Sequence, residues 1–480
     1  MNTIQRLLSN TLLAFLSSII VKAGNALLFI LIGRELGPAA SGSFSLATTY
    51  FTFVFGLSAL GLHEIMVREL PARRDESGRY LVNYVTLRLV LSAAVYGLLL
   101  LGLRLFAPYS DATTAVILIL SLAAIPEAVF SMCQSLFEAH ERLLTPLLAS
   151  AASTTLKLIA GFWLLARGAD VVTIAWVVPL ASLLSLLVFA PGLARLFRRT
   201  PQRLPARLDL GFLRHHLAYM PSFFVIQLFS LLDYQADILL ISLMLSENDV
   251  GLYAAAQTIL LGFNLMPVAV RTALYPVMSR YYVQAPDKLN VLNDKISRYL
   301  LAAILPVATG VTLLARPIIE LVYGPAFGPA VPVLQVSIWA VVFLFLNVPH
   351  SRLALIYNRQ RDAALMLGVT TGLNVTLNLL LIPRAGILGA AVARLLASLA
   401  LFLVFYVYTH TRITPVSLLP SPGRPLLATV LMGLAVWPLR GWPLLVPVAA
   451  GAVVYAAAAL LLNIVPQQDR VYWRELIHRR

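Results

Sequence analysis

Apolar stretches long enough to cross a lipid bilayer recur along almost the whole chain. A membrane-spanning helix needs about 20 largely apolar residues, and about fourteen such stretches lie between charged or Pro- and Gly-rich breaks. The 480-residue chain is 60% hydrophobic and only 12% charged. The sequence therefore predicts an all-α integral membrane protein with about 14 transmembrane helices. The predicted spans are residues 11–33, 39–62, 80–106, 112–136, 146–166, 171–193, 217–245, 250–278, 299–315, 330–357, 362–382, 386–409, 426–439 and 443–464.

The basic residues between these spans predict the topology. Short cytoplasmic connections of membrane proteins carry an excess of Lys and Arg. Most of the 36 Lys and Arg residues fall on one side when the N-terminus is placed in the cytoplasm. This distribution predicts cytoplasmic N- and C-termini. It also explains the net charge of +15 by topology and contact with anionic lipids, so binding of nucleic acid is not expected.

The first span carries Lys22 and no small-residue cleavage site, so we expect a retained helix and not a signal peptide.

Two similar segments indicate an internal repeat. Residues 42–47 open the second span and residues 251–256 open the eighth, and both fit the pattern Gly-x-aromatic-x-x-Ala. Six spans separate them, so the repeat is expected to be parallel, with its axis along the membrane normal. The sequence thus predicts two pseudo-symmetric six-helix lobes around a central cavity, plus a C-terminal helix pair. The expected parts are residues 1–193 (first lobe), 194–216 (basic cytoplasmic linker), 217–412 (second lobe) and 413–480 (helix pair and basic tail).

Several basic side chains lie inside the predicted spans. A charge at the centre of a bilayer costs about 2.5 to 3.5 kcal/mol, so such residues usually face a polar cavity or a partner. Lys22 and Lys157 are central in their helices, and either substrate binding or a structural ion pair would explain them. Arg271, just after Pro267, fits a cavity role or a side chain reaching the membrane surface. Arg88 and Arg352 lie nearer the cytoplasmic ends, where surface-reaching side chains are common.

Three acidic residues also lie inside predicted spans. Glu127 follows Pro126 in the middle of the fourth span, where it either serves a gating or ion-coupling role or neutralises Lys22 or Lys157. Asp233 and Asp237 are one helical turn apart and share a face of the seventh span. A salt-bridge gate, a proton or sodium site and a static contact remain open for this pair. Coupling to the membrane potential, to H⁺ or to Na⁺ is likewise open.

The sequence argues against enzymes and ATP-driven pumps. No phosphate-binding Gly-Lys-Ser/Thr loop and no nucleophile constellation is present. The single cysteine, Cys133, excludes an intramolecular disulfide and a cysteine-based metal cluster. We therefore expect a transporter with no catalytic residues, no metal site and no cofactor.

Three short motifs lie near the ends of predicted spans. Residues 33–38 read Gly-Arg-Glu-Leu-Gly-Pro and are followed by Gly42-x-Phe44. Residues 323–327 read Tyr-Gly-Pro-Ala-Phe, and residues 383–391 read Pro-Arg-Ala-Gly-Ile-Leu-Gly-Ala-Ala. These motifs resemble those of polysaccharide flippases of the MOP superfamily, the Wzx-type group that handles O-antigen and other lipid-linked oligosaccharides. The resemblance extends over nearly the whole chain.

This resemblance implies a function and a location in a prokaryotic inner membrane. It implies transfer of an undecaprenyl-pyrophosphate-linked oligosaccharide from the cytoplasmic to the outer leaflet, by alternating access between the lobes, for surface polysaccharide biosynthesis. The implied partners are the lipid-linked glycan, the bilayer and other glycan-assembly membrane proteins. A flippase for the peptidoglycan precursor lipid II is a close rival. A cation-coupled multidrug exporter of the same superfamily is less consistent with deep basic residues, and a passive lipid-scaffolding protein is a third alternative.

Overall fold

The structure is a computed structural model that describes residues 3–106, 109–199, 207–217, 220–285, 288–419 and 422–464. All regular elements in these residues are helical. The chain forms two compact units, Met1–Ala254 and Ala255–Arg480. The lobe and linker boundaries drawn from the sequence stay a prediction.

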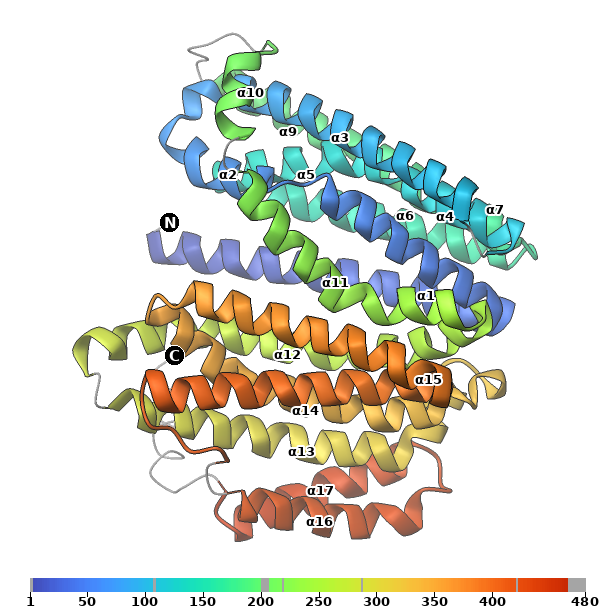
Figure 1. Cartoon of the computed structure of the whole chain (residues 1–480), viewed down its shortest axis with the longest axis vertical. Helices are drawn as coiled ribbons and strands as arrows, with labels where there is room; N and C mark the ends of the chain where they lie inside the picture. The colour runs from blue at the N-terminus through green and yellow to red at the C-terminus, as the bar shows by residue number, and fades with distance from the viewer. Residues whose placement is uncertain are drawn as a thin grey trace. The chain divides into compact units, whose positions relative to one another are not determined.

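The first unit is built from long apolar helices with short connections (Figure 1). Its helices are α1 (Thr3–Leu57), α2 (Leu62–Glu69), α3 (Ser77–Phe106), α4 (Asp111–Leu122), α5 (Ala124–Ala139), α6 (Leu144–Leu165), α7 (Val171–Ala175), α8 (Val177–Ser185), α9 (Phe189–Arg199), α10 (Leu210–Leu217), α11 (Met220–Met244) and the beginning of α12 (Glu247–Gln284). In this unit, the N-terminal end of α1 lies at the same end as α2 and α10, which we call the linker end. The opposite end, where α1 bends and α7 lies, we call the bend end.

The second unit holds the remaining helices. They are the rest of α12, α13 (Leu289–Val322), α14 (Ala330–Ile356), α15 (Gln360–Arg412), α16 (Gly423–Val436) and α17 (Leu445–Leu461). Within this unit the predicted C-terminal helix pair, α16 and α17, forms a hairpin whose α16 packs against α13. Buried Leu314 of α13 contacts Met432 and Val436 of α16, and the hydroxyl of Tyr455 donates a hydrogen bond of 2.5 Å to the carbonyl of Ala302.

The membrane spans agree with the sequence. Nine helical stretches of the described residues are long and apolar enough to cross a membrane. Two of them, Leu12–Leu57 and Gln360–Arg412, each contain two predicted spans, so the nine stretches account for eleven of the predicted spans. The eighth predicted span lies in α12, and the last two correspond to the shorter apolar helices α16 and α17. The prediction of an all-helical, many-span membrane protein is confirmed.

The first two spans are joined by a bend where a loop was expected. Helical structure runs through residues 34–38, interrupted only at Gly37, whose φ of 81° and ψ of −175° are non-helical. Glycine adopts this conformation without the steric penalty of a Cβ atom, and Pro38 is well suited to the first turn of the helix that follows. Gly386, with a φ of 59°, produces the equivalent bend inside α15.

Other helices are interrupted where one straight span was expected. The fourth span divides into α4 and α5 at Ala123, three residues before Pro126. The sixth span divides at Trp176, three residues before Pro179. Proline supplies no backbone N–H and crowds the preceding turn, which explains a break on its N-terminal side. The predicted linker is also partly helical, because α9 extends to Arg199 and α10 occupies Leu210–Leu217.

Candidate functional site

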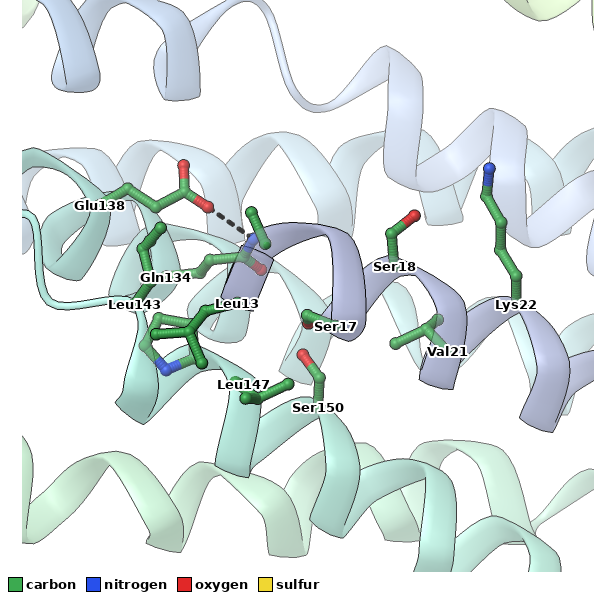
Figure 2. A pocket seen from close by; sticks show the side chains of 12 residues that line it. Leu13, Ser17, Ser18, Val21, Lys22, Gln134, Glu138, Leu143, Leu147 and Ser150 are labelled. Atoms are coloured by element: carbon green, nitrogen blue, oxygen red, sulfur yellow. Dashed lines mark hydrogen bonds between the residues drawn. The ribbon is translucent and has the colours of Figure 1, made fainter. Parts of the chain in front are cut away.

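A groove of about 270 Å³ lies among α1, α5 and α6 in the first unit (Figure 2). Its α1 wall is a stripe of residues spaced by one helical turn, which places them on one face. The polar members of this stripe are Ser17, Ser18 and Lys22, while Ser150 of α6 adds another hydroxyl. Gln134 and Glu138 of α5 are the other polar lining residues, and the apolar ones come from α1, from α6 and from the turn before α6.

Lys22 and Glu138 lie at opposite ends of this groove, with the serine side chains between them (Figure 2). Lys22 is half-buried. Glu138 lies in the last turn of α5 at the linker end, one turn after Gln134. Since α1 rises 1.5 Å per residue, the α1 wall from Leu13 to Lys22 is about 14 Å long. The groove therefore joins the linker end of the unit to a lysine placed deep in the first span.

The carboxylate of Glu138 is held in place by two neighbours. The amide Nε2 of Gln134 donates a hydrogen bond of 2.8 Å to one carboxylate oxygen. The ring Nε2 of His63 lies 3.6 Å from the other oxygen, and the opposite nitrogen of the ring is 2.8 Å from the hydroxyl of Ser135. The Glu138 side chain is still 24% exposed, so its carboxylate remains accessible from the groove. Sequence reasoning did not single out this residue, because an acidic residue at the end of a span is ordinary.

A second cluster of charged side chains in the same unit is centred on Glu127. This residue lies in the first turn of α5 and accepts a hydrogen bond of 2.6 Å from the hydroxyl of Ser182. It also attracts the charges of Arg88 on α3 and Lys157 on α6. Arg88 is only 2% exposed, donates a hydrogen bond of 3.2 Å to the carbonyl of Phe55, and places its guanidinium carbon 4.5 Å from the centre of the Phe55 ring. The structure thus groups three of the predicted site residues, while Lys22 lies in the groove.

The predicted acidic pair on α11 has two different environments. Asp237 is 4% exposed and accepts a hydrogen bond of 2.7 Å from the hydroxyl of Tyr253, the aromatic residue of the second repeat segment. Asp233 is half-buried. Between them, Gln235 accepts a hydrogen bond of 3.0 Å from Thr49 of α1. These contacts make Asp237 part of the packing of α11 and α12, and whether it gates transport or binds an ion stays a prediction.

At the bend end, two glycines allow α1 and α12 to approach backbone to backbone. A Cβ atom on Gly42 would lie 1.7 Å from the carbonyl oxygen of Glu247, and one on Gly251 would lie 1.9 Å from the carbonyl oxygen of Pro38. Ser110 donates a hydrogen bond of 2.9 Å from its hydroxyl to the carboxylate of Glu247. The sequence revealed these glycines as a repeat and did not reveal that they meet.

At the linker end, α10 is fixed to α2 and α3 by a ring cluster. Phe212 and His216 of α10 pack against Tyr80 of α3 with ring centres 4.8 Å and 5.9 Å away. Glu69 of α2 accepts hydrogen bonds from Tyr80 (3.0 Å) and from the 2%-exposed His216 (3.2 Å). Burial acts to raise the pKa of Glu69, but hydrogen bonds from Arg68, His216 and Tyr80 together lower it below the ordinary value.

The basic residues predicted in the second half are less informative. Arg352 lies half-buried on α14. The side chain of Arg271 falls outside the described residues. His350, six residues before the end of α14, is 1% exposed and packs against the rings of Phe402 and Tyr406 of α15. Among the described residues, no group of three or more His, Cys, Asp or Glu side chains is arranged to hold a metal ion.

Comparison with solved structures identifies the class of fold. The chain resembles the lipid II flippase MurJ in its inward closed conformation, with a TM-score of 0.72 and 16% identity, over 98% of this chain and 100% of that one. It also resembles an inward-facing multidrug resistance MATE family transporter of the MOP superfamily, with a TM-score of 0.68 and 16% identity, over 82% and 97% of the two chains. At these identities the likeness shows the fold alone, which is that of a MOP-superfamily transporter.

Comparison of sequences then gives the family. The family model described as "Polysaccharide biosynthesis protein" matches residues 7–282, more than half of the chain. This chain belongs to the polysaccharide biosynthesis protein family, as the motifs predicted. A curated relative, the "Probable flippase AglR" of Haloferax volcanii, is 31% identical over 169 residues. That match covers 34% of this chain and 34% of the relative, so the chain spans about a third of the length of the curated relative it matches.

Proposed function

We propose that this chain is a flippase that moves a polyprenyl-pyrophosphate-linked oligosaccharide, with undecaprenyl as the expected lipid, from the cytoplasmic to the outer leaflet of a prokaryotic cell membrane. The observation that carries the proposal is the position of Lys22 in a groove that runs inward from the linker end, in a member of the polysaccharide biosynthesis family. The predicted topology places the linker end in the cytoplasm, where such lipids are assembled.

The chemistry of the groove suits an anionic head group. A diphosphate loses its hydration when it enters the membrane, and an ammonium group with neighbouring hydroxyls replaces the lost hydrogen bonds. Lys22 supplies the charge, while Ser17, Ser18 and Ser150 supply hydroxyl groups along the groove. The lipid tail stays in hydrocarbon, so only the head group needs a polar path.

The driving force does not require a nucleotide. Moving negative charge outward across an inside-negative membrane is favourable by about 2.3 kcal/mol per charge per 100 mV. The close packing of Pro38–Gly42 against Glu247–Gly251 supports an alternating-access cycle in which the bend end is shut while the linker end admits the head group. Arg88, Lys157, Arg271 and Arg352 remain proposed substrate-binding residues, and Glu127, Asp233 and Asp237 remain proposed gating or ion-coupling residues. Other glycan-assembly membrane proteins are the proposed protein partners.

The test is movement of a fluorescent undecaprenyl-pyrophosphate oligosaccharide between leaflets of proteoliposomes. Lys22→Ala should abolish movement that the native protein supports, whereas Lys288→Ala, at an exposed lysine outside the predicted spans, should not. Movement of lipid II in preference to other lipid-linked saccharides would assign the lipid II role. Extrusion of dyes without movement of any lipid-linked saccharide would assign a drug exporter, and no transport at all would overturn the proposal.

A further inference from the structure

We propose that Gln134 and Glu138 form a saccharide-recognition subsite, which contacts the sugar next to the diphosphate while the diphosphate lies at Lys22. This inference rests on the proposed function and adds to it the residues that distinguish a glycosylated lipid from the bare lipid diphosphate. The two ends of one groove would thus bind two chemically different parts of the same head group (Figure 2).

The polar groups of the subsite match those of a sugar. Sugar hydroxyls both donate and accept hydrogen bonds, so they pair well with a carboxylate, which only accepts, beside an amide, which does both. Glu138 and Gln134 provide this combination one helical turn apart on α5. Their mutual hydrogen bond of 2.8 Å and the His63 ring at 3.6 Å fix the orientation of the carboxylate before a ligand arrives. Preorganised polar groups of this kind favour specific binding because less ordering is needed on association.

The charges of the groove also fix the direction in which a ligand lies. A diphosphate is attracted by the ammonium of Lys22 and repelled by the carboxylate of Glu138. Specificity often depends on such a repulsive element in addition to the attractive one. The anionic part of the head group is therefore directed to the Lys22 end, which leaves the sugar at the linker end, on the side where the glycan enters.

The spacing is compatible with this arrangement. The α1 wall between the two ends is about 14 Å long, enough for a diphosphate followed by the first sugar of a glycan. The hydroxyls of Ser17, Ser18 and Ser150 lie between the ends and are available to the linking oxygens. Apolar side chains of Leu143 and Leu147 line the groove beside these hydroxyls, and hydrogen bonds next to apolar side chains are stronger than in water.

The experiment compares binding of two probes to purified full-length protein in nanodiscs. The probes are undecaprenyl diphosphate and undecaprenyl diphosphate carrying one N-acetylhexosamine. Hydrogen bonds to a charged group contribute about 1.5 to 3 kcal/mol, so the native protein should prefer the glycosylated probe by about tenfold or more. Glu138→Gln should lose that preference while it binds the bare diphosphate as well as, or more tightly than, the native protein. Glu141→Gln, a neighbouring exposed carboxylate, should keep the preference.

The outcomes separate the two proposals. If the native protein binds neither probe, the proposed function fails. If the native protein prefers the glycosylated probe and Glu138→Gln keeps the same preference, the saccharide subsite is refuted and the flippase proposal stands. Binding of the bare diphosphate by Glu138→Gln also reports that the variant is folded. Should that variant bind neither probe, Gln134→Leu is judged by the same criterion, and its retained preference would refute the subsite.

Discussion

Gly42 and Gly251 pack against each other through their backbones at the bend end of the first unit. A Cβ atom on either glycine would come within 3.0 Å of the backbone nitrogen of the other. The carbonyl that each glycine meets belongs to the residue one turn before its partner, Glu247 in one case and Pro38 in the other. The contact is therefore symmetric between two segments that the sequence relates as repeats.

Enlarging either glycine should open this contact. A Cβ atom 1.7 Å from a carbonyl oxygen cannot be accommodated unless the two helices separate, and overpacking of this kind costs about 1 to 3 kcal/mol. We expect Gly42→Val and Gly251→Val to lower the unfolding temperature and to impair lipid transport in proteoliposomes. Gly97→Ala is the matched control, because a Cβ atom there meets no atom within 4 Å. Native stability and transport in the Gly42→Val protein would show that the helices do not need this approach.

Removing the charge of Glu127 should destabilise the first unit. Arg88 and Lys157 would lose a neighbouring negative charge, and the hydroxyl of Ser182 would donate to a neutral amide oxygen instead of a carboxylate. We expect Glu127→Gln to lower the free energy of unfolding by about 1 to 3 kcal/mol, measured by thermal unfolding in nanodiscs. In a Lys157→Met background the same change should cost less. Equal costs in both backgrounds would show that the two charges are not coupled.

The hydrogen bond between Tyr253 and Asp237 should contribute to the stability of the α11–α12 packing. Both side chains are buried, so Tyr253→Phe leaves the carboxylate of Asp237 short of one donor. The expected loss is about 1 to 3 kcal/mol of unfolding free energy. Tyr253→Phe combined with Asp237→Leu should cost less than the sum of the two single changes in a double-mutant cycle. If the costs of the two single changes add exactly in the double variant, the hydrogen bond does not contribute to stability.

Acidification should destabilise the protein through His140, in the turn after α5. Burial first, and the charges of Arg74 and Arg142 second, lower the pKa of His140 to about 4. The unfolded chain has an ordinary histidine pKa of about 6.5, so between these values the unfolded state binds a proton that the native state does not. The contribution of neutral His140 to the free energy of unfolding is thus fully present above about pH 6.5 and falls as the pH decreases toward about 4.

A comparison of unfolding at pH 7 and pH 5 measures this contribution. Over this interval the free energy of unfolding of the native protein should fall by up to about 2 kcal/mol more than that of the His140→Gln variant. The effect begins at the unfolded-state pKa of about 6.5, and the remaining pH change of about 1.5 units corresponds to that amount. The variant also reports the titration of all other groups, which both proteins share. An equal loss in the two proteins would mean that His140 is protonated in the native state.

The spans could be predicted from the sequence because a bilayer imposes a length and a composition on each helix. The breaks before Pro126 and Pro179 were not predicted, although the missing backbone donor of proline explains them. The helical continuity through residues 34–38 was not predicted, because a Gly-Pro pair between two apolar stretches fits a loop as well as a bend.

The candidate site was predictable only in part. A lysine such as Lys22 in an apolar run is conspicuous, since the bilayer makes its charge costly. Glu138 and Gln134 are ordinary residues for the end of a span, and only the arrangement of α1, α5 and α6 brings them to the groove that contains Lys22. The grouping of Glu127 with Lys157 and Arg88 likewise depends on which helix faces are adjacent, which one sequence does not specify.

The compact first unit continues beyond the predicted linker, through α11 and the first two turns of α12, to Ala254. A half-protein expressed as residues 1–216 would lack Leu231, which packs where Gly56 leaves space, and Gln235, which pairs with Thr49. The exposed faces of α1 would then favour aggregation. Split-protein or complementation studies that need a self-sufficient first fragment should therefore keep α11 and the beginning of α12 together with the helices before them.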